Sequence, residues 1–350
     1  MKRFKEKNLQ DLDLKKILIR SANWIGDGIM TTPAVRTIRE NFPKAEISLL
    51  ALPWVADIFA VSPHVDRVIV YDKKGRHRGL RGLTRLSNDL RRQNFEAAIL
   101  LQNAFEAAFL TWNAGIPVRA GYKRDCRGPL LNYGVDPNNH GQNKHQVYYY
   151  QDLLARLGLT VGSEKLFLQL SESDRVWAQK YKSCLKSSPV IGLNPGAAYG
   201  PAKCWPAKRY SDLAGLLHEK TGAEFLVFGA AIDKETGRQI AEQGRGYIHN
   251  LAGETTLGQA MALISICDAF VTNDSGLMHV AAAAETPLVA IFGSTDAVAT
   301  GPFAANASVM QKQMSCQPCL KKSCDSGFRC MLDISVDEVA EEVLKKVKES

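Results

Sequence analysis

The residues best suited to chemistry lie in short polar turns that follow apolar runs. Asp274, Ser275 and Gly276 come after the run that ends at Val271, and an alanine-rich helix is predicted behind them, with His279 near its start. A helix start presents free N–H groups and the positive end of the helix dipole, so it favours anions. In the plainer alternative, Asp274 is only the N-cap and His279 an ordinary helix residue.

A second turn of this kind spans Asn194–Pro206, where prolines and glycines force a loop between an apolar run and a predicted helix. Lys203 lies in this loop just before the helix, where a lysine can meet a phosphate together with backbone N–H groups. An exposed surface lysine is the alternative. If the two turns meet at one sheet edge, Lys203 and the helix start at Ser275 and Gly276 would hold a diphosphate.

The third turn is Trp24–Gly28, in which Gly26 and Gly28 flank Asp27. A carboxylate held by a rigid turn can serve as a general base, although an N-cap role is equally consistent with the pattern. The turn lacks the GxGxxG spacing of a dinucleotide fingerprint, which argues against a nicotinamide-dependent oxidoreductase.

Two segments are strongly basic. Lys73–Arg92 contains eight lysines and arginines against a single acid, Asp89, and Lys123–Arg127 adds a shorter basic run. Such runs are often only solvated surface, and the alternative is contact with anionic lipid headgroups or a phosphorylated acceptor. No stacking aromatics interleave with these residues, so we expect no nucleic-acid partner. The acceptor contacts that we select from these segments are Lys73, Lys74, Arg124 and Arg127.

Four of the eight cysteines cluster near the C-terminus with the spacing Cys316-x2-Cys319-x4-Cys324-x5-Cys330. Clustered thiolates can hold zinc or an iron–sulfur cluster. The spacing differs from the paired CxxC motifs of a zinc ribbon. We therefore expect reduced or partly bridged thiols and no metal or other cofactor, with a metal at these four residues as the alternative.

Composition places the chain among globular proteins with room for two domains. Of its 350 residues 45% are hydrophobic and 23% charged, and the net charge of +8 favours anionic partners. The first sixteen residues are highly charged, and no apolar run reaches the length of a membrane span. We therefore expect no export signal and a cytoplasmic location, with peripheral contact to an anionic membrane surface.

Strands alternate with helices in both halves of the sequence, which predicts βαβ units and parallel sheets. The expected fold is α/β, with two Rossmann-like lobes facing a central cleft. We place the lobes at 1–165 and 166–332, followed by a C-terminal helix in 333–350. The main predicted strands are Lys16–Arg20, Glu46–Ala51, Arg67–Tyr71, Ala97–Leu101, Val118–Ala120, Pro189–Leu193 and Glu224–Phe228.

Several blocks of sequence resemble the lipopolysaccharide heptosyltransferases of glycosyltransferase family nine, and most closely the type II enzymes. These blocks include SANWIGDGIMTTPAVRTI, GYKRDCRGPLL, NPGAAYGPAKCWPAKRY and NDSGLMHVAAAAETPLVAIFGST, in family order. The resemblance implies a GT-B fold in which the N-terminal lobe binds the acceptor and the C-terminal lobe binds the nucleotide sugar. It also implies that the last helix packs back across the N-terminal lobe.

The resemblance further implies an inverting, metal-independent transfer of heptose from ADP-heptose to the heptosylated Kdo2-lipid A core, on the cytoplasmic face of the inner membrane. The Asp-x-Asp pattern at Asp11 and Asp13, typical of metal-dependent transferases, precedes the first strand and carries little weight. The alternatives are transfer one step earlier to Kdo2-lipid A, use of another nucleotide sugar, or a two-lobed solute-binding protein. We expect a monomer. The residues carried over are Asp27 as base and Lys203, Asp274, Ser275, Gly276 and His279 as donor contacts.

Overall fold

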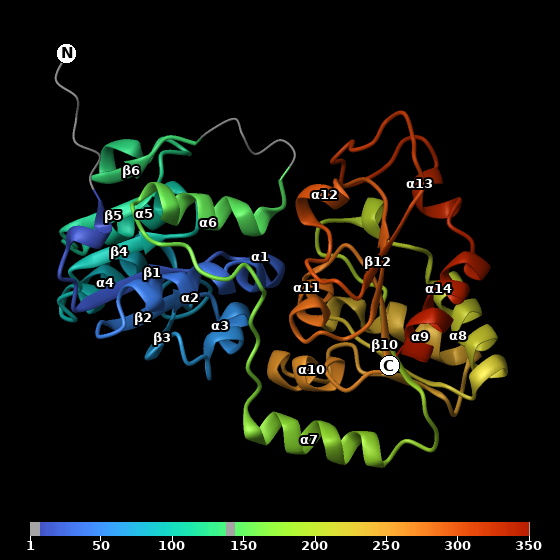
Figure 1. Cartoon of the computed structure of the whole chain (residues 1–350). Helices are drawn as coiled ribbons and strands as arrows, with labels where there is room; N and C mark the ends of the chain where they lie inside the picture. Colours follow the sequence, from blue (N-terminus) through green and yellow to red (C-terminus); the bar gives the residue numbers. More distant parts are fainter. Residues whose placement is uncertain (1–7, 138–143, 350) are drawn as a thin grey trace. The chain divides into compact units, whose positions relative to one another are not determined.

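The computed structural model describes residues 8–137 and 144–349, which form two compact units that divide between Gln169 and Leu170 (Figure 1). The sequence placed the boundary four residues earlier. Each unit contains a six-stranded sheet in which every pair of neighbouring strands is parallel. Each unit is therefore an α/β layer structure in its own right.

The first sheet has the strand order β3-β2-β1-β4-β5-β6. The chain moves outward from β1 in one direction and then returns to β4 to build the other half, so the switch point lies between β1 and β4. Ile17, Leu18 and Ile19 are all fully buried, as expected of a parallel strand covered on both faces. The strands are β1 (Lys16–Arg20), β2 (Glu46–Ala51), β3 (Arg67–Val70), β4 (Ala97–Leu100), β5 (Val118–Tyr122) and β6 (Tyr133–Val135).

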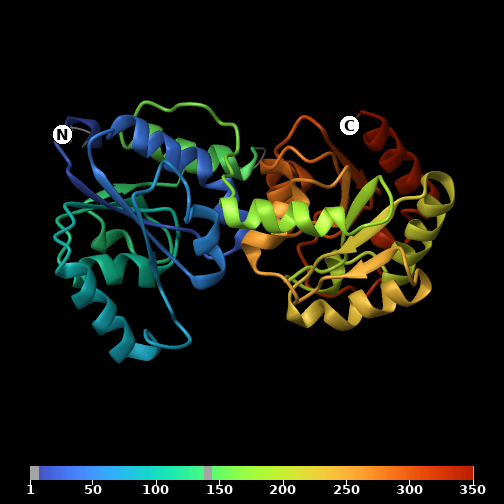
Figure 2. The same cartoon turned by 90° about the horizontal axis from the view of Figure 1, so that it is seen from below.

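Helices cover both faces of this sheet, with α4 and α5 on one face and α2 and α6 on the other (Figure 2). Leu18, Leu50 and Leu100 pack toward α4 and α5, since alternate residues of a strand point to the same side. The helices are α1 (Ile25–Met30), α2 (Thr32–Asn41), α3 (Pro53–Phe59), α4 (Gly79–Arg91), α5 (Phe105–Asn113) and α6 (Gln146–Arg156), with 3-10 turns at Leu9–Asp11 and Gly128–Leu130.

The second sheet has the order β12-β11-β10-β7-β8-β9, so its switch point lies between β7 and β10. This is the same topology as in the first unit, read from the opposite edge. The adjacent ends of β7 and β10 therefore provide the expected location for a ligand. The strands are β7 (Val190–Asn194), β8 (Glu224–Val227), β9 (Ile248–Asn250), β10 (Ala269–Asn273), β11 (Leu288–Phe292) and β12 (Ala307–Gln311).

One large hydrophobic core lies between this second sheet and helices α8, α9 and α14. On the opposite side α10 packs against α7 and α11. The helices are α7 (Glu172–Ser183), α8 (Ala207–Thr221), α9 (Lys234–Gln243), α10 (Leu257–Ile264), α11 (Gly276–Ala283), α12 (Ala297–Thr300), α13 (Arg329–Leu332) and α14 (Val336–Glu349), with 3-10 turns at Pro201–Lys203 and Ala231–Asp233.

The C-terminal helix α14 corrects one expectation. It was predicted to pack across the first lobe, but Val339, Ala340 and Val343 are buried in the core of the second unit, against α8, β10 and β11. The indole N–H of Trp205 donates to the carbonyl of Ile334 at 3.1 Å, which fixes the start of the helix beside α8. An amphipathic pattern predicts that one face is buried, but it does not identify the partner.

Within residues 8–137 and 144–349, every helix is too short or too polar to span a bilayer.

Candidate active site

The ends of β7 and β10 are joined through side chains at the switch point of the second unit. Asn194, the last residue of β7, donates from Nδ2 to Thr272 Oγ1 at 2.9 Å and to Ser275 Oγ at 2.5 Å. Asn194 is almost fully buried, so these hydrogen bonds are shielded from water. They fix the turn after β10 against the end of the neighbouring strand. Sequence reasoning missed Asn194, although a polar residue that ends a buried strand is a usable signal.

Asn273, the last residue of β10, makes a similar connection to the loop that carries Lys203. Its Oδ1 accepts hydrogen bonds from the backbone N–H of Trp205 at 3.0 Å and the hydroxyl of Tyr210 at 3.1 Å. Its Nδ2 donates to the carbonyl of Pro195 at 2.7 Å. Both ends of the Lys203 loop are therefore held at the carboxyl edge of the sheet. This residue, too, was missed from the sequence.

Lys203 and Asp274 form an ion pair at this edge, with Lys203 Nζ 2.5 Å from Asp274 Oδ2. Thr295, which follows β11, donates from Oγ1 to the same carboxylate oxygen at 2.7 Å. The side chains of Lys203 and Asp274 are only 14% and 6% exposed. The pair thus keeps a nearly buried ammonium at the end of a parallel strand, where it can receive an anionic ligand.

The start of α11 differs by one residue from the prediction. Ser275, not Asp274, is the N-cap residue, and Gly276 is the first helical residue. Asp274 is not the N-cap residue. Its carboxylate accepts hydrogen bonds from Lys203 and Thr295 and does not cap the N–H groups of the helix. The helix start itself lies directly after β10, as predicted. Its first-turn N–H groups therefore lie at the same sheet edge as the ammonium of Lys203.

His279 lies in the first turns of α11 and is 3% exposed. The sequence pointed to a donor contact at this position. In the structure this residue is almost fully buried, and a contact with the donor at this position stays a prediction.

Asp27 lies in the first turn of α1, directly after β1 at the switch point of the first unit. The N-cap residue of α1 is Trp24, so the alternative in which Asp27 caps the helix is wrong. A carboxylate in the first turn still benefits from the helix dipole. Gly28 packs closely against α3, because an added Cβ would lie 3.0 Å from the side chains of Val55 and Ile58, which would have to shift slightly to admit it.

Tyr150 on α6 was not predicted to belong to this site. Its hydroxyl lies 3.5 Å from Asp27 Oδ1, and the residue is 4% exposed. Burial, followed by the negative charge of Asp27, raises the pKa of Tyr150 well above its usual range. The hydroxyl therefore keeps its proton at neutral pH and is oriented toward the carboxylate. No motif in the sequence links these two residues, which are 123 positions apart.

If Asp27 is the base that the sequence resemblance implies, replacing Tyr150 by phenylalanine should lower turnover moderately without changing the affinity for nucleotide. The ring still fills its buried position, but the long hydrogen bond to Asp27 is lost. A neutral hydrogen bond contributes about 0.5–1.5 kcal/mol, so we expect turnover to fall by roughly 2- to 10-fold. Steady-state rates and a thermal melt, measured on the same preparation, test this. Unchanged turnover in a normally folded variant would show that the hydroxyl does not orient Asp27.

The four predicted acceptor contacts lie in different environments. Lys73 Nζ forms an ion pair with Glu106 at 2.7 Å, and Lys74 Nζ lies over the ring of Trp54 at 5.7 Å. The Arg124 guanidinium lies over Tyr149 at 5.8 Å. Lys73, Lys74 and Arg124 are exposed, so all three are accessible to an anionic ligand.

Arg127 is different, because its side chain is fully buried. Its guanidinium donates to the carbonyls of Tyr122 and Gln102 and to Asn103 Oδ1. Burial lowers the pKa of Arg127 to about 10, which leaves it charged at neutral pH. The geometry gives Arg127 a structural role that holds the loop after β5, and we no longer count it among the acceptor contacts.

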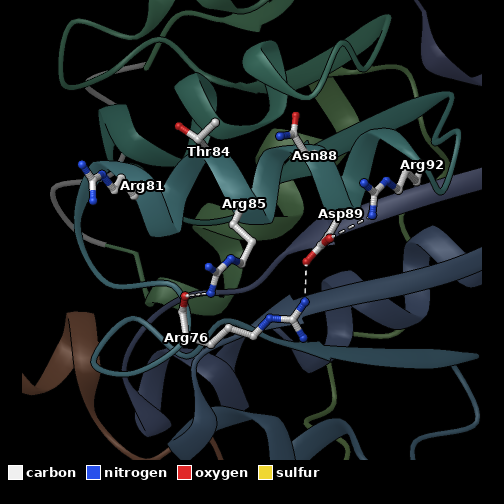
Figure 3. A pocket seen from close by; sticks show the side chains of 7 residues that line it. All are labelled: Arg76, Arg81, Thr84, Arg85, Asn88, Asp89 and Arg92. Atoms are coloured by element: carbon white, nitrogen blue, oxygen red, sulfur yellow. Dashed lines mark hydrogen bonds and ion pairs between the residues drawn. The ribbon is translucent and has the colours of Figure 1, made fainter.

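A depression of about 460 Å³ lies along α4 in the basic segment, and Figure 3 shows the side chains around it. One acid, Asp89, faces several arginines and forms an ion pair with Arg76 at 2.9 Å. We call this depression the arginine pocket. Its excess of guanidinium groups favours the binding of anions. Its lining residues are Arg76, Arg81, Thr84, Arg85, Asn88, Asp89 and Arg92.

Two Rossmann-like α/β units, with a lysine and a helix start at the switch point of the second, have the architecture of GT-B glycosyltransferases. The family model for glycosyltransferase family 9 (heptosyltransferase) matches residues 83–328, and the chain belongs to this family. The Escherichia coli K12 lipopolysaccharide heptosyltransferase 2 is 32% identical over 94% of this chain and 97% of its own length.

Solved structures agree with this assignment. The E. coli ADP-heptose lipopolysaccharide heptosyltransferase II matches with a TM-score of 0.80 and 32% identity, covering 95% of this chain and 99% of that one. A family 9 glycosyltransferase from Veillonella parvula matches with a TM-score of 0.87 and 27% identity, covering 97% and 99%. The protein is therefore a glycosyltransferase with the GT-B fold.

Proposed function

We propose that this glycosyltransferase moves L-glycero-D-manno-heptose from ADP-heptose to the heptosyl-Kdo2-lipid A inner core during lipopolysaccharide biosynthesis. Similarity to relatives named heptosyltransferase 2 over nearly the whole chain supports the donor and acceptor. The structural observation that carries the proposal is the nearly buried Lys203 ammonium beside the start of α11. That arrangement suits the diphosphate of a nucleotide sugar.

The donor contacts act on the leaving group. Negative charge grows on ADP as the bond between the anomeric carbon and the diphosphate breaks. Lys203 and the N–H groups at the start of α11 stabilise this charge, and Asp274 and Thr295 keep the ammonium in position. Because these groups supply the positive charge, the proposed reaction needs no metal ion on the substrate.

The acceptor hydroxyl attacks the anomeric carbon from the face opposite ADP. Its oxygen forms the new glycosidic bond, its proton passes to the carboxylate of Asp27, and the electron pair of the broken bond leaves with ADP. Tyr150 orients the Asp27 carboxylate for this step. A single displacement of this kind inverts the configuration at the anomeric carbon.

The first unit also carries the basic groups that suit an anionic acceptor. Lys73, Lys74 and Arg124, together with the arginine pocket, supply positive charge for phosphates and Kdo carboxylates at a membrane surface. We propose that the protein works as a monomer at the cytoplasmic face of the inner membrane.

Reversing two charges in the arginine pocket, as Arg81→Glu/Arg85→Glu, should weaken binding to vesicles that contain anionic lipid. A basic residue near such a surface contributes about 1 kcal/mol, so removing two should weaken binding by roughly 30-fold or more. Lys220→Glu/Arg245→Glu makes the same charge change at exposed positions of the second unit and serves as the control. Equal losses in both variants would mean that only net charge matters. Vesicle co-sedimentation at several salt concentrations measures the difference.

The decisive experiment follows ADP release from ADP-heptose with heptosyl-Kdo2-lipid A, with Kdo2-lipid A, or without acceptor, and with or without added Mg²⁺. We expect release only with the heptosylated acceptor and no requirement for Mg²⁺. Release with Kdo2-lipid A alone would place the enzyme one step earlier in core assembly. If ADP is released with neither acceptor, the proposed donor is wrong, and a UDP-sugar would be the next donor to test.

A further inference from the structure

The outer side of α5 carries a row of aromatic side chains that the proposed chemistry does not use. Phe105, Phe109 and Trp112 follow one another at spacings of four and three residues, so they lie on one face of the helix. The ring centroids of Phe105 and Phe109 are 6.2 Å apart, and those of Phe109 and Trp112 are 5.9 Å apart. The three rings therefore form one continuous series, which we call the aromatic row.

The aromatic row is open to solvent. Phe105 and Trp112 are each 49% exposed, and Phe109 is partly exposed. The hydrophobic core of the first unit is supplied by the other side of the helix, where Ala107 and Leu110 are buried. Packing within this unit therefore does not account for three large rings on the outer side. Neighbouring exposed apolar groups of this size are typical of a surface that contacts a partner.

Basic side chains lie at both ends of the aromatic row. At the start of α5, Lys73 Nζ forms an ion pair with Glu106 at 2.7 Å. At the end of α5, the guanidinium of Arg91 donates a hydrogen bond to the backbone carbonyl of Asn113. Lys73 and Arg91 are both exposed, so a ligand on this side of the unit meets their charges. Glu106 offsets the charge of Lys73, so most of the excess positive charge must come from elsewhere.

The neighbouring helix α4 supplies that excess. Both helices cover the same face of the sheet and bury leucines in one core, so their outer sides face the same way (Figure 2). The arginine pocket lies along α4, with four arginines against the single acid Asp89 (Figure 3). Leu80, in the first turn of α4, is also exposed and adds an apolar group. The outer sides of α4 and α5 thus combine an apolar strip with a positive surface.

This combination fits the surface of an anionic bilayer. Tryptophan and phenylalanine side chains are favoured at the boundary between lipid headgroups and acyl chains, where helices that lie on membranes place them. The polar faces of such helices are rich in lysine and arginine, which are attracted to anionic lipids. The aromatic row and the arginine pocket supply these two kinds of contact on adjacent helices.

We propose that the outer sides of α4 and α5 form a membrane-docking face. The aromatic row enters the boundary between the headgroups and acyl chains of an anionic bilayer, and the arginine pocket contacts the lipid phosphates. Burial of the rings gives the contact a component that salt does not remove, which charge attraction alone lacks. The role of docking in delivering a lipid acceptor rests on the proposed function, whereas binding to the bilayer does not.

Docking on this face brings the acceptor edge of the first sheet to the bilayer. β4 ends at Leu100, and α5 begins at Phe105 after a short turn. β4 lies beside β1, and Asp27 follows β1 at the same edge of the sheet. The start of the aromatic row therefore lies at the edge that carries Asp27. An acceptor anchored in the bilayer by its acyl chains presents its sugars to this edge.

Co-sedimentation with vesicles tests the docking face without any turnover. Phe105→Ser/Trp112→Ser should bind vesicles of phosphatidylethanolamine and phosphatidylglycerol roughly tenfold or more weakly than the parent protein, because lipid can bury about half of each ring. Val176→Ser/Ile232→Ser removes two exposed apolar side chains from the second unit, and this matched control should bind as the parent does.

Salt separates insertion of the rings from attraction between charges. At about 1 M salt the screening length falls to about 3 Å, so attraction between exposed charges is largely lost. The parent protein should then keep part of its vesicle binding, and Phe105→Ser/Trp112→Ser should lose that part. If the parent and this variant bind equally at low and at high salt, the docking face is wrong.

Quenching of tryptophan fluorescence tests whether the aromatic row enters the bilayer. The signal of Trp112 is the difference between the parent protein and Trp112→Phe. Lipids with brominated acyl chains should quench this signal when vesicles are bound. Trp177 on α7, measured in the same way with Trp177→Phe, is the control and should not be quenched. Equal quenching of the two tryptophans would contradict insertion of the row.

A second copy of this chain is the competing occupant of the docking face. Sedimentation of the parent protein and of Phe105→Ser/Trp112→Ser in the absence of lipid tests it. We expect both to sediment as monomers. A parent dimer that this variant converts to a monomer, with vesicle binding unchanged, would make the face an interface between copies and overturn docking.

Transfer to two forms of the acceptor distinguishes failure of docking from failure of the proposed function. Phe105→Ser/Trp112→Ser should use a deacylated, water-soluble heptosyl-Kdo2 acceptor at the parent rate, and an acceptor embedded in vesicles several-fold more slowly. Parent rates with both forms would mean that the docking face does not deliver the acceptor. If the parent protein uses neither form, the proposed function is wrong, and the binding of vesicles still decides whether the face docks.

Discussion

Asp27→Asn should nearly abolish heptose transfer while ADP binding stays normal. Asparagine has the same shape and can still accept a hydrogen bond from Tyr150, but it cannot take the proton of the acceptor hydroxyl. A positioned general base contributes about 10²–10⁴-fold, so we expect a loss of this size in kcat. ADP affinity should not change, because the donor contacts that we propose all belong to the second unit.

The matched control replaces the carboxylates of the Asp-x-Asp pattern, as Asp11→Asn/Asp13→Asn. These two residues are exposed and precede β1, so transfer should be close to that of the parent enzyme. If this double variant is inactive and Asp27→Asn is active, the base is misassigned and the reaction depends on a metal held at the N-terminal pattern. Single-turnover rates with saturating ADP-heptose separate chemistry from acceptor binding in both variants.

The sequence was sufficient to predict two α/β units and the sheet edges at which the candidate site residues lie. Alternation of apolar runs with helical patterns located β1 and β2 with the bounds that the structure has. The short strands β6, β9 and β12 were missed, because three to five residues at a sheet edge carry little apolar periodicity. The prediction that α14 packs on the first unit was wrong for a different reason. The position of this helix is decided by tertiary packing against α8, which its own sequence does not reveal.

The site was predicted as a set of turns but not as a set of contacts. Asp27, Lys203 and Ser275 follow strands at the two switch points, which the rule for parallel sheets anticipates. The pairing of Lys203 with Asp274 joins residues 71 positions apart and depends on the rotamers of both side chains. Arg127 is a second contact that the sequence could not predict, because a basic run does not reveal which of its arginines is buried.

Lys203→Met should weaken both ADP binding and transfer, and it should also destabilise the protein. Losing a preorganised donor to the leaving diphosphate typically costs about 3–4 kcal/mol, or roughly 10²–10³ in rate. The same change leaves the nearly buried carboxylate of Asp274 without its cation, which costs about 3–5 kcal/mol when a buried pair is broken. Low activity in this variant alone would therefore not distinguish a catalytic role from a structural one.

The double variant Lys203→Met/Asp274→Asn separates the two roles. The neutral amide can still accept the hydrogen bond from Thr295, so the stability lost in Lys203→Met should largely return. ADP affinity and transfer should stay low, because the ammonium that we propose as the contact for the diphosphate is still missing. Thermal melts and ADP titrations of both variants provide the comparison. If stability and ADP affinity recover together, Lys203 acts as the partner of Asp274, and the start of α11 must hold the diphosphate without it.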